Sequence, residues 1–261
     1  MTGRRTLVTA HAGCLGTVPN SRTNIEAALA CGADIVEVDI RATKDGIVIL
    51  THDDTLVLSN GRTARIGELD WDTLRKLPTS GNAGRGRAGS ASTFSTAYLR
   101  LDELLDMVRG QDRVLNLDAK EIGAMVLASR LLRDRNMVTD AVFSGLDREG
   151  IAAAAERLSG FRYLFNADAH VPAGGGGLAE IALVCSLASA SAACGINLEW
   201  TKASGHLVDY ANRRCLPVLL WTVDEPRDMA TALRTGPYSI TTNRPDALGA
   251  LLRPGIGKQG E

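Results

Sequence analysis

The sequence has neither a long hydrophobic run nor an excess of charge of one sign. Its 261 residues include 29 basic and 30 acidic side chains, whereas nucleic-acid-binding proteins usually carry a basic excess. The longest apolar candidate, 178–193, is interrupted by a glutamate, a cysteine and several serines, and it falls short of the roughly 18 residues of a membrane helix. The apolar run 6–10 is too short for a signal-peptide core. We therefore expect a cytoplasmic protein with no nucleic-acid partner and no integral membrane segment.

Paired cysteines and a composition typical of disorder are absent as well. The five cysteines are scattered and form no CxxC pair, which argues against a disulfide framework or a structural zinc site. The hydrophobic fraction of 45% and the charged fraction of 23% are typical of a soluble globular domain. We expect reduced, mostly buried thiols at Cys14, Cys31, Cys185, Cys194 and Cys215.

Short apolar runs alternate with helical patterns along the whole chain. We expect extended segments at 6–10, 35–40, 47–51, 114–118, 141–144, 161–165, 196–198, 217–223 and 238–241. Counting 35–51 as one barrel strand with an appended hairpin gives eight strands, nearly all followed by a helix. This rhythm predicts an α/β fold, a single (β/α)8 TIM barrel over 1–261. The alternative is a doubly wound open sheet, but no glycine-rich dinucleotide-binding motif follows the first strand.

The regular pattern stops after the second barrel strand. Residues 58–98 are polar and glycine-rich, and 79–92 have almost no large apolar side chain. Segments of this length without regular structure are usually lids or binding loops. We predict that 58–98 form an irregular insertion with such a role.

Charged and ionisable side chains gather at the carboxyl ends of the predicted strands, where a TIM barrel has its active site. They are His11, Glu37, Asp39, His52, Asp53, Asp118 and Lys120. Glu37 and Asp39 are two residues apart on one strand, so both side chains point to the same face. Like charges on one buried face repel each other unless a cation lies between them. Three carboxylates from two strands suit Mg²⁺ or Ca²⁺, and two histidines can supply an acid and a base.

Each of these residues also has a purely structural interpretation. Glu37 and Asp39 would then pair with Arg41 and Lys120 in an ion network, and a single E-x-D on a strand is weak evidence for a metal. We expect His170 and His206 to be structural. The glycines 174–177 are expected to form a connector, because no GK[ST] sequence follows them. Clustering at consecutive strand ends favours a functional site for the remaining residues.

Several motifs, in this order, resemble those of the glycerophosphodiester phosphodiesterase family. That family has H-R-G, P-E-N-T, G-A-D-x-x-E-x-D, T-x-D-G and H-D near its start, then E-x-K, S-F-D, W-T-V and T-D-R-P. The corresponding segments here are 11–13 (HAG), 19–21 (PNS), 32–39 (GADIVEVD), 43–46 (TKDG), 52–53 (HD), 118–120 (DAK), 143–147 (FSGLD), 221–223 (WTV) and 242–245 (TNRP). The resemblance covers nearly the whole chain.

This resemblance implies a metal-dependent TIM-barrel phosphodiesterase that releases an alcohol and a phosphomonoester from a small glycerophosphodiester-like substrate. It implies a divalent ion on Glu37, Asp39 and Asp118, and an acid/base pair formed by His11 and His52. It implies further that Lys120 contacts the phosphate, that Trp221 lines the alcohol pocket, and that Asn20 helps to hold substrate or metal.

Three departures from the family pattern leave the alcohol of the substrate open. Ala12 replaces the arginine of H-R-G, the P-E-N-T element lacks its glutamate and is one residue shorter, and Asp118 replaces a glutamate. A sugar phosphodiester or a lysophospholipid is an alternative substrate, and a synthase or lyase reaction is an alternative activity. A barrel that binds phosphodiesters without catalysis is a second alternative, although both histidines and all carboxylates are retained.

Overall fold

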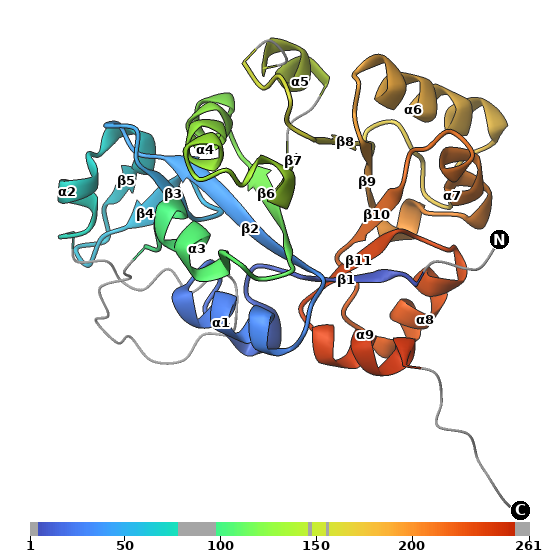
Figure 1. Cartoon of the computed structure of the whole chain (residues 1–261), viewed down its shortest axis with the longest axis horizontal. Helices are drawn as coiled ribbons and strands as arrows, with labels where there is room; N and C mark the ends of the chain where they lie inside the picture. The colour runs from blue at the N-terminus through green and yellow to red at the C-terminus, as the bar shows by residue number, and fades with distance from the viewer. Residues whose placement is uncertain (1–4, 78–97, 146–147, 155–156, 254–261) are drawn as a thin grey trace, which may run out of the picture.

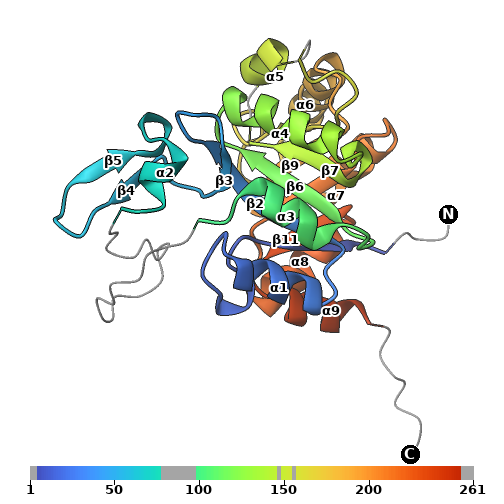
Figure 2. The ribbon, with the colours of Figure 1, turned by 60° about the vertical axis from the view of Figure 1, so that its left-hand side comes forward.

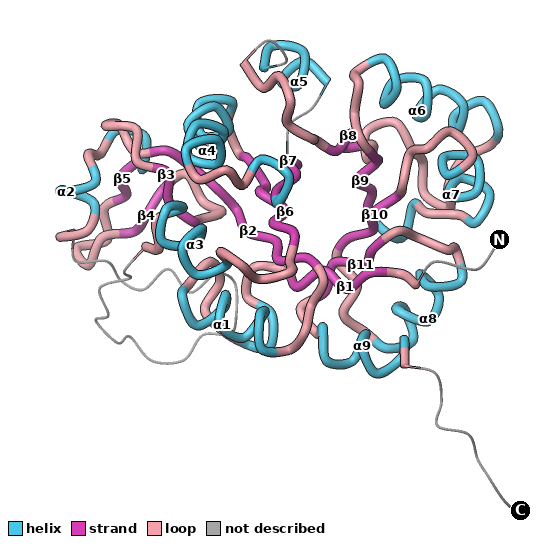
Figure 3. Tube along the Cα trace, viewed as in Figure 1, coloured by secondary structure: helices cyan, strands magenta, loops and turns pink. Residues whose placement is uncertain are grey.

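The computed structural model describes residues 5–77, 98–145, 148–154 and 157–253, and in it eight parallel strands form a nearly closed barrel (Figures 1 and 3). The strands are β1 (Leu7–Ala10), β2 (Ile35–Ala42), β6 (Val114–Ala119), β7 (Ala141–Ser144), β8 (Leu164–Asn166), β9 (Gly195–Glu199), β10 (Val218–Trp221) and β11 (Ser239–Thr242). Their order is β7-β6-β2-β1-β11-β10-β9-β8. A parallel bridge between Phe143 and Tyr163 brings β8 next to β7. The predicted TIM barrel is confirmed.

The helices surround the ring of strands, as Figure 3 shows in cyan. They are α1 (Arg22–Ala30), α3 (Leu101–Val108), α4 (Ile122–Asp134), α5 (Arg148–Ala154), α6 (Leu178–Ala190), α7 (Gly205–Asn212), α8 (Pro226–Arg234) and α9 (Pro245–Leu252). Local sequence explains several helix starts. Ser21 and Ser204 accept a hydrogen bond from a backbone N–H of the first turn, and Pro226 and Pro245 stand at a first helical position, where no N–H is needed. Short 3-10 turns cover Cys14–Gly16, Ile66–Glu68, Val138–Asp140 and Trp200–Lys202.

Alternation along the strands separates two apolar layers. Residues such as Val36, Val38 and Ile40 on β2 belong to the large core between the strands and the helices. Val142, Leu164 and Leu219 form a separate buried cluster. Each of these three precedes by two residues a side chain that lines the main cavity, so it faces the barrel interior one layer deeper. We call this cluster the barrel plug.

Part of the segment predicted to be irregular has regular structure. Within 58–98, β5 (Thr63–Arg65) forms a hairpin with β4 (Thr55–Val57), which lies just before this segment. The expected extended run 47–51 contains β3 (Val48–Leu50), which pairs antiparallel with β2. Together with α2 (Trp71–Leu74) this region has its own small core of Ile49, Leu56, Ile66 and Leu74. Figure 2 shows the hairpin and α2 protruding to one side of the barrel. Residues 78–97, which contain the whole of 79–92, lie outside the described residues, so a lid or binding role for 58–98 stays a prediction.

None of the helices in the described ranges is long and apolar enough to cross a membrane. The location of the protein in the cell stays a prediction. The five cysteines are free thiols; Cys14 and Cys185 are buried and Cys215 is exposed.

Candidate active site

A cavity of about 320 Å³ opens at the carboxyl ends of the barrel strands. Its lining comes from strands β2, β6, β7, β8, β9, β10 and β11 and from the residues that follow β1, β3, β6, β7 and β10. The lining residues are His11, Glu37, Asp39, His52, Asn116, Asp118, Lys120, Ser144, Gly145, Asn166, Asn197, Trp221, Thr222 and Thr241. Of the eight residues predicted to act as catalytic, substrate-binding or metal-binding groups, all but Asn20 therefore line one cavity. Asp53, expected beside His52 at the strand ends, does not line it either.

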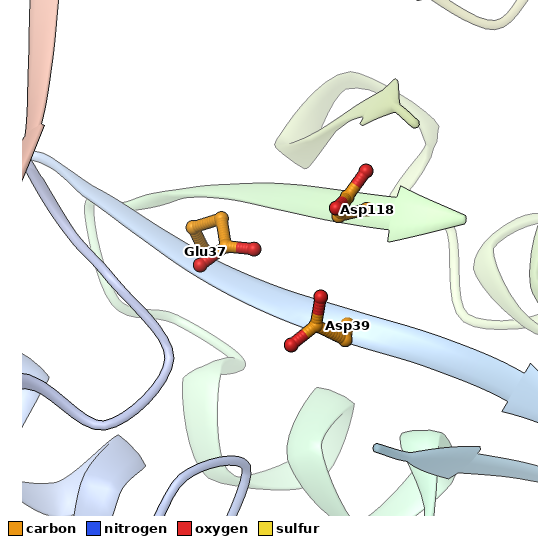
Figure 4. Close-up of side chains that lie close together, drawn as sticks. All are labelled: Glu37, Asp39 and Asp118. Atoms are coloured by element: carbon orange, nitrogen blue, oxygen red, sulfur yellow. The ribbon is translucent and has the colours of Figure 1, made fainter. Parts of the chain in front are cut away.

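Three carboxylates meet on neighbouring strands of this cavity. Asp39 on β2 stands opposite Asp118 on β6, and Glu37 lies two residues before Asp39 (Figure 4). One oxygen of each of the three carboxylates lies within 4.8 Å of the others. Burial, together with the charges of Asp39 and Asp118, raises the pKa of the Glu37 carboxyl well above its usual value. Such a cluster favours a bound positive charge.

Lys120 supplies one positive charge to this cluster. Its Nζ lies 2.7 Å from Asp39 Oδ1 and also donates to Asp118 Oδ2. Burial lowers the pKa of Lys120, but the charges of Asp118 and Asp39 outweigh burial and raise it above its usual value. One ammonium does not balance three carboxylates. The buried oxygen donors and the remaining negative charge fit a divalent metal ion.

The purely structural interpretation, in which the carboxylates pair with Arg41 and Lys120 in an ion network, holds only for Lys120. Lys120 does pair with Asp39 and Asp118. Arg41, in contrast, donates from Nε to the backbone oxygen of His52 at 2.8 Å. Arg41 therefore holds the loop that carries His52. Among the described lining residues Lys120 is the one Lys or Arg side chain.

The two histidines differ in their surroundings. His11 Nε2 lies 4.0 Å from Glu37 Oε2, and its Nδ1 lies 2.9 Å from Asn243 Oδ1. His52 is more exposed, with 68% of its side chain accessible, and its Nδ1 lies 2.9 Å from Asp53 Oδ1. Each ring is thus held through Nδ1, which leaves Nε2 available to a substrate. The histidines predicted to be structural do not line the cavity; His170 stacks on Phe165 and His206 is exposed at the start of α7.

Asn20 and the backbone of Ala12 hydrogen-bond to the carboxylates of Asp39 and Glu37, respectively. The Asn20 side chain donates from Nδ2 to Asp39 Oδ2 at 2.8 Å, and its Oδ1 accepts from the Asp39 backbone N–H at 3.0 Å. Asn20 is buried and orients Asp39; its predicted contact with substrate stays a prediction. The backbone N–H of Ala12 donates to Glu37 Oε2 at 2.9 Å. The Ala12 side chain is buried and is not among the lining residues.

Gly145 permits the position of Asp118. Its φ is +94°, in the left-handed region that few other residues adopt. A Cβ at this position would lie 2.2 Å from Asp118 Oδ1 and 2.5 Å from the backbone oxygen of Ala119. Glycine at 145 is therefore required by a close approach between the loop after β7 and a carboxylate of the site.

Sequence reasoning missed the uncharged lining residues Asn116, Ser144, Asn166, Asn197 and Thr241. A signal for two of them was present. Asn116 lies two residues before Asp118 on the same strand, so both must face the barrel interior. Ser144 is the last residue of β7, and Asp118 is the last but one of the neighbouring strand β6. The Ser144 Oγ donates to Asp118 Oδ1 at 3.2 Å.

The comparison with known families agrees with the geometry of the cavity. A sequence model described as the glycerophosphoryl diester phosphodiesterase family matches residues 11–247. The chain belongs to this family. The predicted class, a phosphoric diester hydrolase, is thereby confirmed. Members of this family generally depend on a divalent metal ion.

Relatives and solved structures match over nearly their full length. A glycerophosphodiester phosphodiesterase of Caldanaerobacter subterraneus is 25% identical over 259 residues, which cover 96% of this chain and 99% of the relative. The crystal structure of a glycerophosphodiester phosphodiesterase from Agrobacterium tumefaciens has a TM-score of 0.74 at 20% identity, covering 94% of this chain and 99% of that one. A phosphodiesterase of Oleispira antarctica, solved with its product sn-glycerol-3-phosphate, has a TM-score of 0.74 at 16% identity, covering 94% and 96%. At these identities the structures establish the shared barrel.

Proposed function

We propose that the protein hydrolyses a small glycerophosphodiester-like substrate to an alcohol and a phosphomonoester, with a divalent metal ion and with His11 and His52 as acid and base. The observation that carries this proposal is the meeting of three carboxylates, two histidines and one lysine at a single cavity. Membership of a phosphodiesterase family supports the same reaction.

Glu37, Asp39 and Asp118 would hold the metal ion, and their oxygen donors suit Mg²⁺ or Ca²⁺. When bound, such an ion polarises a phosphoryl oxygen and stabilises the negative charge of the transition state. Lys120 lies beside two of these carboxylates and adds a second positive charge at the phosphate. The remaining steps are proton transfers.

We assign the base to His11 and the acid to His52. His11 Nδ1 is engaged by Asn243, so Nε2 is the nitrogen that takes the proton of the attacking hydroxyl, either from water or from a neighbouring hydroxyl of the substrate. Asp53 Oδ1 lies 2.9 Å from His52 Nδ1 and orients the ring, which gives a proton from Nε2 to the leaving alkoxide. Because His52 is largely exposed, it can recover a proton from solvent after each turnover.

A panel of phosphodiesters, each tested with and without EDTA, examines this proposal. We expect turnover that stops with EDTA and returns with added Mg²⁺ or Ca²⁺. Asp39→Asn should abolish both activity and metal binding, because it removes a ligand charge and keeps the side-chain shape. Full turnover in a chelated sample would contradict the metal requirement.

The products decide between the reaction types. Hydrolysis releases a phosphomonoester, a lyase stops at a cyclic phosphate, and a synthase joins two alcohols. Detection of the phosphomonoester as the final product supports the proposal, whereas a cyclic phosphate that persists would assign a lyase. Binding of a diester with no product at all would assign a non-catalytic barrel.

A further inference from the structure

Each of the two aspartates of the site has one oxygen held by an uncharged donor. Asn20 Nδ2 donates to Asp39 Oδ2 at 2.8 Å, and Ser144 Oγ donates to Asp118 Oδ1 at 3.2 Å. Both donor residues are buried, with 5% and 3% of their surface exposed. These bonds orient the two carboxylates, which stand opposite each other on β2 and β6. The other oxygen of each, Asp39 Oδ1 and Asp118 Oδ2, is left for a shared partner, and we call these two atoms the inner oxygens.

The ammonium group of Lys120 binds both inner oxygens. Its Nζ lies 2.7 Å from Asp39 Oδ1 and donates to Asp118 Oδ2. The inner oxygens therefore converge on one cation, although they come from different strands. The same two carboxylates, together with Glu37, form the group whose oxygens lie close enough together to hold a metal ion. Lys120 and a divalent ion thus call on the same pair of aspartates.

Lys120 is also the most mobile of the three side chains that hold the aspartates. Asn20 is tied to Asp39 twice, through the carboxylate and through the backbone N–H. Ser144 is short and belongs to a barrel strand. Lys120, in contrast, has a flexible four-carbon stem, its side chain is 18% accessible, and it lines the cavity. When the partners of the aspartates change, Lys120 is therefore the group that can move.

We infer that Lys120 is an exchangeable internal cation, whose ammonium holds the inner oxygens until a divalent ion binds them and then turns into the cavity. A divalent ion on the inner oxygens would lie beside the ammonium, and like charges so close together repel strongly. The released ammonium would face the part of the cavity where the proposed reaction places the phosphate. The inference rests on the proposed function and adds an order of binding to it, with the metal ion before the diester.

Chemical labelling of the lysines measures this release without any need for turnover. Limited acetylation with acetic anhydride, followed by mass spectrometry, compares the reactivity of each lysine with and without Ca²⁺. We expect Lys120 to react several-fold faster with Ca²⁺, because its ammonium leaves the two carboxylates for the open cavity. Lys202 is the internal control, since its Nζ donates to the backbone oxygen of Asp168 at 2.6 Å and it does not line the cavity. Equal or slower labelling of Lys120 with bound Ca²⁺ would overturn the inference.

Removal of the ammonium should strengthen metal binding. Lys120→Met keeps an apolar side chain of similar length and removes the competing cation, so the dissociation constant for Ca²⁺ in titration calorimetry should fall about tenfold, as expected for one hydrogen bond between charged groups. The metal-free variant should melt at a lower temperature than the unmodified protein, because its aspartates lose their shared cation, and Ca²⁺ should raise its melting temperature by more. Lys202→Met is the matched control and should leave the affinity unchanged. Equal or weaker Ca²⁺ binding in Lys120→Met would contradict the exchange.

The outcomes separate this inference from the proposed function. If neither Ca²⁺ nor Mg²⁺ gives a binding heat or a shift in melting temperature with the unmodified protein, the metal requirement and the exchange are both wrong. If the ion binds and turnover depends on it, but neither the labelling of Lys120 nor the affinity of Lys120→Met responds as expected, only the exchange is wrong.

Discussion

The side-chain oxygen of Asn243 lies 2.9 Å from Nδ1 of His11, across 232 residues of sequence. The other end of the same amide donates to Asp224 Oδ2 at 2.8 Å, and the Asn243 backbone N–H donates to Asp224 Oδ1 at 2.7 Å. Because the amide nitrogen is committed to a carboxylate, the amide oxygen faces the ring and accepts. Neutral His11 therefore carries its hydrogen on Nδ1 and leaves the lone pair on Nε2.

Loss of the Asn243 amide should impair catalysis more than substrate binding. In Asn243→Leu the His11 ring loses the acceptor that selects its tautomer, so kcat should fall about tenfold or more while KM changes little. Nitrogen NMR of labelled His11 should show a single Nδ1–H tautomer in the unmodified protein and a mixture in the variant. Asn212→Leu, at the exposed end of α7, is the control. An unchanged tautomer in Asn243→Leu would contradict this role.

Asn20 should act through Asp39. Asn20→Ala removes both hydrogen bonds that orient the Asp39 carboxylate, so metal affinity should fall about 10- to 100-fold. Titration calorimetry with Mg²⁺ and Ca²⁺ measures this directly. If saturating metal restores kcat, Asn20 is a positioning residue. If kcat stays low and KM for substrate rises at saturating metal, the direct substrate contact predicted from the sequence is the better assignment.

Removal of either histidine should slow the reaction by about two to four orders of magnitude. His52→Ala and His11→Ala should keep the melting temperature close to that of the unmodified protein, because both residues lie at strand ends and are only partly buried or exposed. The rate of the unmodified enzyme should fall at both acidic and alkaline pH, since one ring must be protonated and the other neutral. Near-normal kcat in His52→Ala would contradict its role as the acid.

Gly145→Ala should damage the metal site and the fold together. The new Cβ would overlap Asp118 Oδ1 and the Ala119 oxygen, and φ at +94° disfavours any side chain. We expect a loss of about 1–3 kcal/mol in the free energy of unfolding and weaker metal binding. Gly123→Ala in α4, where nothing lies within 4 Å of the added atom, is the matched control and should be neutral or slightly stabilising. If Gly145→Ala and Gly123→Ala changed the free energy of unfolding in urea by the same amount, the close approach at Gly145 would not require glycine.

The barrel and most of its site could be predicted because their signals are local. Alternation in Ile35–Ala42 places Glu37 and Asp39 on one face without any knowledge of the remaining chain. The hairpin of β4 and β5 escaped prediction because each strand has three residues with little apolar periodicity. The contact between Asn243 and His11 exists only because β11 pairs with β1 when the barrel closes, and no local pattern reports that pairing.

The barrel plug lies at the floor of the cavity, on the side away from its mouth. Val142, Leu164 and Leu219 are buried one layer below the lining residues of β7, β8 and β10 and form an apolar floor there. In the proposed reaction, the alcohol and the phosphomonoester would leave by the same mouth through which the diester enters. The product that lies deeper in the cavity would leave only after the shallower product, and a new diester would compete with both products for the same entrance.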